Sequence, residues 1–153
     1  MGNGIPPDAL TVAFVDPTGV DASLEMLRPL TTGRKVNLLI LFPDYMDIIR
    51  NVEKTYSVQP DSNLDHVLGP DSGWRERWSS LPDQSAEKVS KLFLEIYKKQ
   101  LRTHLGYSVF ADEVLRFRKN APLYRILFAS KNDLGLKFWQ ESTKKERGSN
   151  RLF

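Results

Sequence analysis

Two short, almost wholly apolar runs, each followed by a proline and an aspartate, constrain this chain more than any other feature. Residues 10–15 read LTVAFV and run into Asp16-Pro17, and residues 36–42 read VNLLILF and run into Pro43-Asp44. Short runs rich in β-branched residues and bounded by turn residues are typical of strands that are buried on both faces, as in a parallel sheet covered by helices. We therefore predict two buried parallel strands.

Helical periodicity follows the first run. Leu24, Leu27 and Leu30 recur at helical spacing, which predicts a helix over about 21–31 that Pro29 ends. Strands and helices that alternate over a short stretch indicate a right-handed parallel βαβ unit. The other predicted elements are helices at about 45–55, 84–105 and 134–146, short helical turns at 61–68 and 74–79, and a hairpin of two β-rich runs, 107–118 and 123–130.

These elements predict an α/β fold in one domain. We expect a Rossmann-like partial sheet of parallel strands with flanking helices and a C-terminal antiparallel β-hairpin, over residues 9–147. Residues 1–8 hold two glycines and two prolines without periodicity and are expected to be a flexible lead-in, and 148–153 a loose tail. The length of 153 residues suits one domain.

The amino-acid composition excludes several classes of functional site. The chain has no cysteine, which excludes a disulfide scaffold, a thiolate metal site and a cysteine nucleophile, and its two histidines disfavour a metallohydrolase. The sequence shows no leader and no membrane span, so we expect a cytoplasmic protein. Residues 1–73 carry five Lys/Arg against ten Asp/Glu, and residues 74–153 carry seventeen against nine. The basic second half could face phosphate, or it could form ordinary solvated faces.

Ligands of open α/β sheets bind beyond the carboxyl ends of the strands, which selects the residues after the two apolar runs. Asp16 could accept hydrogen bonds from an amine or a cofactor, while Pro17 and Gly19 shape a stiff turn around it. The alternative is a structural turn in which the aspartate binds backbone N–H groups. Asp44 occupies the equivalent place after Phe42, as a substrate-binding candidate or a helix cap.

Polar and aromatic side chains in the second half supply further candidates. Trp74 and Trp78 lie four residues apart beside Arg75 and Arg77. Such a set can stack bases and bind phosphates, or it can close a loop onto the core. Lys131, just after the last predicted strand, could reach a neighbouring site as a substrate-binding residue.

The two histidines complete the candidates. His66 and His104 stand apart and in no ligand pattern, so no metal is expected. His104 lies near the end of the predicted helix at 84–105, where a cation interacts favourably with the helix dipole. A structural role at that helix terminus is the interpretation that we favour for it.

Several stretches together resemble the three-Cys-motif partner proteins (TcmP), a bacterial and phage family. The resemblance spans about residues 10–146 and covers the C-terminal half of the family. The stretches that carry it are AFVDPTG at 13–19, NLLILFPD at 37–44, the loop containing Leu68-Gly69 and Gly73-Trp74, and PLYRILFASKNDLGLKFW at 122–139.

The resemblance implies a fold and a set of catalytic residues. Members are similar in fold to S-adenosylmethionine-dependent methyltransferases, whose sheets finish with an antiparallel hairpin. Asp16, Pro17 and Gly19 match the family's D-P-x-G turn, which stands where amine-modifying methyltransferases have their catalytic loop. Thr18 replaces the usual aromatic residue, which weakens the case for a nucleobase substrate.

The resemblance also implies partners. The family's cofactor is S-adenosylmethionine, yet no glycine-rich loop for it is visible here, so we expect this chain to be a truncated domain that is inactive alone. A partner protein with the three-cysteine motif, similar to radical-SAM enzymes, is implied. A sheet without its upstream strands would have an open edge and could self-associate. The alternative is a non-catalytic module that binds nucleic acid or a protein partner.

Overall fold

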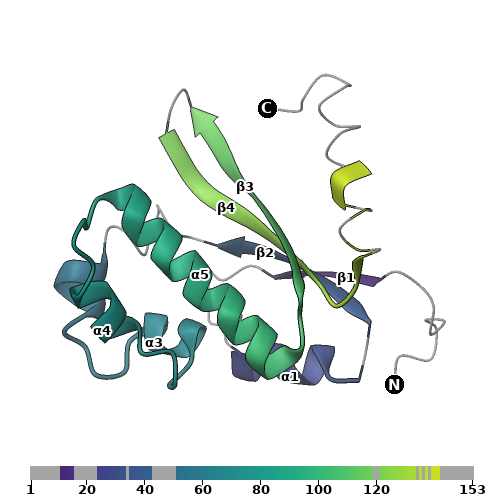
Figure 1. Cartoon of the computed structure of the whole chain (residues 1–153), viewed down its shortest axis with the longest axis horizontal. Coiled ribbons are helices and arrows are strands. Elements are labelled where there is room, and N and C mark those ends of the chain that lie inside the picture. The colour runs from purple at the N-terminus through teal and green to yellow at the C-terminus, as the bar shows by residue number, and fades with distance from the viewer. Residues whose placement is uncertain are drawn as a thin grey trace.

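The computed structural model describes residues 11–15, 24–33, 35–42, 51–118, 121–133, 135, 137 and 139–141. Figure 1 shows helices packed against a twisted sheet. The strands are β1 (Thr11–Val15), β2 (Val36–Phe42), β3 (Val109–Arg118) and β4 (Ala121–Ser130). The helices are α1 (Leu24–Thr31), the π-helix η2 (Val52–Tyr56), α3 (Asn63–Leu68), α4 (Trp74–Ser79) and α5 (Ala86–Leu105).

The sheet is mixed, with the strand order β1-β2-β4-β3. β1 and β2 are parallel, with Thr11 opposite Val36. β4 is antiparallel to both of its neighbours, with Leu38 opposite Ala129 on the β2 side. The predicted α/β class, the parallel pair and the terminal hairpin are therefore all present. The sheet is only partly parallel, because β4 lies between β2 and β3.

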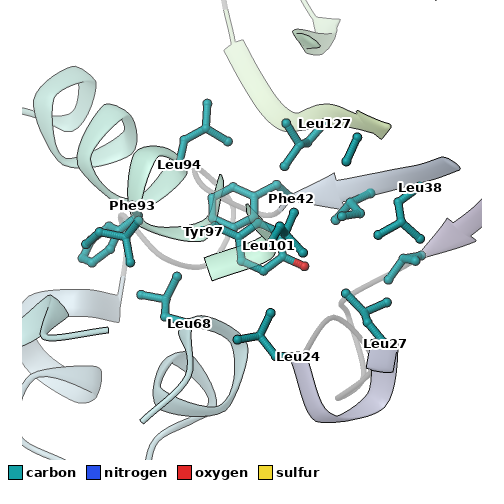
Figure 2. Close-up of a cluster of buried hydrophobic side chains, with 14 of the residues drawn as sticks. Leu24, Leu27, Leu38, Phe42, Leu68, Phe93, Leu94, Tyr97, Leu101 and Leu127 are labelled. Atoms are coloured by element: carbon teal, nitrogen blue, oxygen red, sulfur yellow. The ribbon is translucent and has the colours of Figure 1, made fainter. Parts of the chain in front are cut away.

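One face of the sheet and the helices enclose the core. Alternate residues of β2, among them Leu38 and Phe42, are fully buried and face α5 through Tyr97 and Leu101 (Figure 2). The rings of Phe42 and Tyr97 lie 5.3 Å apart. Helix α5 buries a continuous stripe of its surface, as the spacing of its apolar residues predicts, and ends at Gly106 in the left-handed conformation. It therefore organises the helical layer.

The opposite face of the sheet is covered in part by the chain after β4. The rings of Phe128 and Trp139 stack with their centroids 5.3 Å apart. Gly135 approaches the fully buried Ser130 so closely that an added Cβ would lie 2.1 Å from its hydroxyl oxygen. The amide nitrogen of Asn37 is buried on β2 and finds no hydrogen-bond partner among the described residues. The described residues of 133–141 are helical and begin one residue before the predicted helix at 134–146.

The structure corrects two details of the first predicted helix. Leu24 and Leu27 are buried, but Leu30 is half exposed, and Thr31 takes the third inward position. The helix also continues for two residues beyond Pro29. Proline at this late position removes only one N–H donor, and the Thr31 hydroxyl donates to the Leu27 carbonyl at 3.0 Å in the final turn. The predicted helix at 45–55 lies mostly outside the described residues, which show η2 from Val52.

The two strands of the hairpin are shifted from their predicted bounds. β3 begins two residues later than predicted, at Val109, and β4 begins two residues earlier, because Ala121 and Pro122 belong to it. Proline cannot donate a ladder hydrogen bond and is tolerated in strands at bulges. The register of β3 against β4 shifts on both sides of Arg116, which lies opposite Pro122. A local irregularity therefore accommodates the proline within the strand.

Candidate functional site

The carboxyl ends of β1 and β2 lie at the same edge of the sheet. The two strands are parallel, and Val15 at the end of β1 is paired with Ile40, two residues before the end of β2. The chain continues from these ends into the two predicted site segments. Asp16, Pro17, Gly19 and Asp44 themselves lie outside the described residues, so their roles stay predictions.

A cationic cluster that the sequence analysis missed lies beside the carboxyl end of β2. Arg125 of β4 is paired with Phe42, the last residue of β2. Its guanidinium donates to Asp112 at 2.7 Å and to the Ser90 hydroxyl at 3.4 Å. Lys98 of α5 reaches the other oxygen of Asp112 at 3.3 Å. Two cations therefore share one carboxylate close to the edge where ligands of such sheets bind.

Trp74 closes the loop onto the core. Its side chain is 2% exposed and meets the ring of Phe93 edge to face, with centroids 5.7 Å apart. Its indole N–H donates to Asp65 at 2.9 Å. In this position the indole packs inside the protein. Of the two alternatives for Trp74, the described contacts match the one in which it anchors the loop.

Arg75 is held by several internal partners. Its guanidinium binds both oxygens of Asp65, one of them at 2.7 Å, and donates to the carbonyls of Tyr56 and Gln59. The Arg75 guanidinium also lies 4.6 Å from the centre of the Trp74 ring. Tyr56 is the last residue of η2 and Gln59 follows it, and the end of a helix leaves backbone acceptors without internal donors. Arg75 thus fastens the end of η2 to α3 and α4.

Asp65 is the centre of this network. Burial alone would raise the pKa of Asp65, but hydrogen bonds from Arg75, from the Ser62 backbone and from Trp74 outweigh it and hold the pKa far below its ordinary value. Ser62 and Asp65 also form a capping box at the start of α3, with the Ser62 N–H donating to the carboxylate at 2.8 Å. The Ser-x-x-Asp spacing is the sequence signal that could have identified this acceptor.

Lys131 lies at the other end of the sheet. β4 is antiparallel to β2, so the chain beyond Ser130 emerges near the amino end of β2. The Lys131 ammonium donates to the Thr31 carbonyl at the end of α1 at 2.8 Å and lies 5.2 Å from the centre of the Tyr107 ring. Partial burial lowers the pKa of Lys131. The structure therefore does not bring Lys131 together with Trp74 and Arg75.

His104 binds an aspartate that follows α3. Its Nε2 lies 2.8 Å from Asp71, whose other oxygen accepts from Gln100 at 2.7 Å. The hydrogen bond from Gln100, followed by that from His104, lowers the pKa of Asp71. The contact ties the chain after α3 to the last turns of α5, as expected of a structural histidine. His66 lies 3.2 Å from the exposed Asp61.

Comparison of the chain with protein-family models, curated proteins and solved structures finds no match. Among the described residues, no cluster of three or more His, Cys, Asp or Glu side chains could hold a metal ion. The helices in the same part of the chain are too short or too polar to cross a membrane. Function has therefore to be inferred from the strand order and from the side chains near the carboxyl ends of the strands.

Proposed function

We propose that this chain is a TcmP-like, methyltransferase-like protein that supplies the substrate side of a methyl-transfer site and is inactive alone. The observation that carries the proposal is the strand arrangement. A parallel pair, β1 and β2, is followed by a hairpin whose second strand, β4, is inserted antiparallel beside β2. The resemblance to methyltransferases implies a terminal hairpin of this kind, which plain dinucleotide-binding sheets lack.

In this proposal, the turn after β1 carries the chemistry. Asp16 follows directly on β1 and would accept a hydrogen bond from the amine that receives the methyl group, with Pro17 and Gly19 shaping the turn. Asp44, after the parallel neighbour β2, would contact the substrate. Arg125 and Lys98, which both contact Asp112, would place two cations near the same edge.

The described residues do not fit S-adenosylmethionine by themselves. A cofactor loop of this class needs glycines in the turn directly after a strand. The described glycines with positive φ are Gly33, Gly69, Gly73 and Gly106, and each follows a helix or lies between two helices. The cofactor loop would have to come from strands that join the free edge of β1, on the same polypeptide or on a partner with the three-cysteine motif.

The test begins with the cofactor. Calorimetry of this chain with S-adenosylmethionine should show no binding, and micromolar affinity would contradict the proposal. The whole reading frame, including any codons before Met1, should bind the cofactor and transfer a labelled methyl group to a fraction of host RNA, DNA or protein. Absence of cofactor binding by that polypeptide, both alone and together with the three-cysteine-motif partner, would also overturn it.

Substitution of Asp16 then tests the role of the turn. In the same polypeptide, Asp16→Ala should lower methyl transfer by about 100-fold or more and leave the cofactor affinity unchanged. A loss of this size is usual when the side chain that accepts from the reacting amine is removed. Glu25→Ala, an exposed acidic residue on α1, is the matched control and should retain full activity. Full activity of Asp16→Ala would remove Asp16 from the mechanism.

A second candidate function, nucleic-acid binding, is favoured by the outer face of α5. Lys88, Lys91, Lys99 and Arg102 are exposed on this helix, with Glu95 among them. Binding through them should weaken steeply with salt, by a slope of about 0.9 per phosphate contact. Replacing the three lysines by Gln should flatten that slope, whereas Lys54→Gln on η2 should not.

A further inference from the structure

Strand β1 forms an outer edge of the sheet. Its only partner among the described residues is β2, so the backbone groups on its other side have no strand to pair with. Edge strands are usually protected by a charge, a proline or a bulge, because an unprotected edge pairs with another strand. Residues 11–15 read TVAFV and contain neither a charge nor a proline. Within the part of the chain that the structure describes, this edge is therefore available to a further strand.

Exposed apolar side chains gather on the two elements at this edge. Among the residues whose burial the structure describes, five large apolar side chains are exposed, and four of them are on β1 and α1, each between 42% and 63% exposed. They are Val12 and Phe14 on β1, and Met26 and Leu30 on α1. The fifth, Val58, follows η2 elsewhere in the molecule. Val12 and Phe14 lie on the face of β1 opposite Val15 and the core, whereas α1 packs on the core side, so apolar side chains are exposed on both sides of this edge. Exposed apolar side chains that gather beside an edge indicate an interaction surface.

The helical geometry of α1 directs its two exposed apolar residues away from the rest of the helical layer. Leu24 lies near Leu68 of α3, and Leu27 lies closer to the sheet (Figure 2). Each step of three residues turns the side chain by about 60° in the same sense, because a helix has 3.6 residues per turn. The side chain of Leu30 is therefore turned a further step beyond that of Leu27, away from α3 and α5. Met26 lies one helical turn before Leu30 and on the same side of α1.

The two exposed apolar residues of β1 suit a second copy of the same strand. In an antiparallel pair centred on Ala13, Val12 of one copy lies opposite Phe14 of the other, and the reverse pair forms by symmetry. Opposite residues lie on the same face, so both exposed pairs are covered at once. We propose that two copies of this chain pair antiparallel through β1 about a two-fold axis at Ala13, with Val12 opposite Phe14.

Charge on α1 is compatible with this two-fold arrangement. Glu25 and Arg28 are both exposed on the helix, so each copy offers one acidic and one basic group. A two-fold interface uses the same patch on both subunits and must be self-complementary. The exposed charges of α1 therefore sum to zero in each copy, so the two helices do not repel one another through a net charge. This inference goes beyond the proposed function and does not rest on it. The dimer occupies the β1 edge as long as no other strand pairs with β1.

Sedimentation of the purified chain tests the proposal. The mass should rise from monomer to dimer with concentration, and Phe14→Lys should weaken the dimer by about tenfold or more, because it places an ammonium in the apolar pair. Val58→Lys is the matched control, a slightly more exposed apolar residue elsewhere in the molecule, and should dimerise like the parent. A monomer at every concentration, or equal effects of the two variants, would overturn the proposal.

Cysteine cross-linking tests the register and does not depend on a destabilising variant. The chain has no native cysteine, so a single substitution gives an unambiguous product. Opposite residues of antiparallel strands have Cα atoms about 4.5–5.5 Å apart, within disulfide range. Ala13→Cys should therefore form a disulfide-linked dimer under mild oxidation, and Val58→Cys should not. Cross-linking of Ala13→Cys no faster than Val58→Cys would refute the two-fold at Ala13, without bearing on methyl transfer.

Discussion

Replacing Asp65 by alanine should be among the most damaging polar substitutions in this chain. The change removes the capping box at the start of α3, which costs about 1 kcal/mol. It leaves the buried Trp74 N–H without its acceptor, which costs about 1–3 kcal/mol. The ion pair with Arg75 adds less than about 1 kcal/mol, because that guanidinium is 37% exposed. We expect a loss of about 3 kcal/mol in the free energy of unfolding.

Urea denaturation followed by tryptophan fluorescence and by circular dichroism measures this loss. Asp61→Ala is the matched control, because Asp61 also contacts a nearby side chain, His66, but its own side chain is 79% exposed. Its substitution should cost less than about 0.5 kcal/mol. The reasoning is refuted if Asp65→Ala costs less than about 1 kcal/mol, or no more than Asp61→Ala, since the network would then not hold α3 and α4 in place.

Three further predictions concern the stability of the fold. Gly135→Ala should destabilise by about 1–3 kcal/mol in thermal unfolding, although alanine is the better helix former, because its Cβ would overlap Ser130. Asp65 and Asp71 have pKa values below the ordinary 3.8 in the folded state, so the stability that they contribute is present above about pH 4 and lost as the pH falls through the folded values. Urea midpoints between neutral and acid pH should show this decline, and Asp65→Asn should make it shallower. Tyr107→Phe removes a 2.6 Å hydrogen bond to the first residue of β2 and should cost about 1 kcal/mol in urea denaturation.

Local patterns in the sequence were sufficient for most of the secondary structure. The apolar stripe of α5, the two strands and the short helical turns predicted at 61–68 and 74–79 depend on neighbours within a few residues, and all of them are present. The predicted burial on both faces is wrong for β1, because Val12 and Phe14 are exposed. The helical spacing correctly predicted that Leu24 and Leu27 are buried, but the same prediction was wrong for Leu30. Three-residue spacing drifts around a helix by about 60° per step, so only two of three such leucines can face one core.

Long-range hydrogen bonds could not be predicted in the same way. The pairing of Asp65 with Arg75, and of Arg125 with Asp112, joins residues that are at least ten positions apart. The sequence alone does not indicate which carboxylate lies within hydrogen-bonding distance of a given arginine. Lys131 shows the same limit, because its position depends on the direction of β4 against β2. The roles of Asp16, Pro17, Gly19 and Asp44 stay predictions.

The central position of β4 has a consequence for how the chain folds. β1 and β2 are near in sequence, and so are β3 and β4, but the two pairs join where Leu38 meets Ala129. Pairing β2 with β4 closes a loop of about 90 residues, which costs chain entropy before the new contacts stabilise the fold. Contacts between residues so distant in sequence slow folding. The β1-α1-β2 unit and the α5-β3-β4 unit can each form early, and the seam between β2 and β4 closes last. Substitutions along that seam should therefore act mainly on the rate of unfolding.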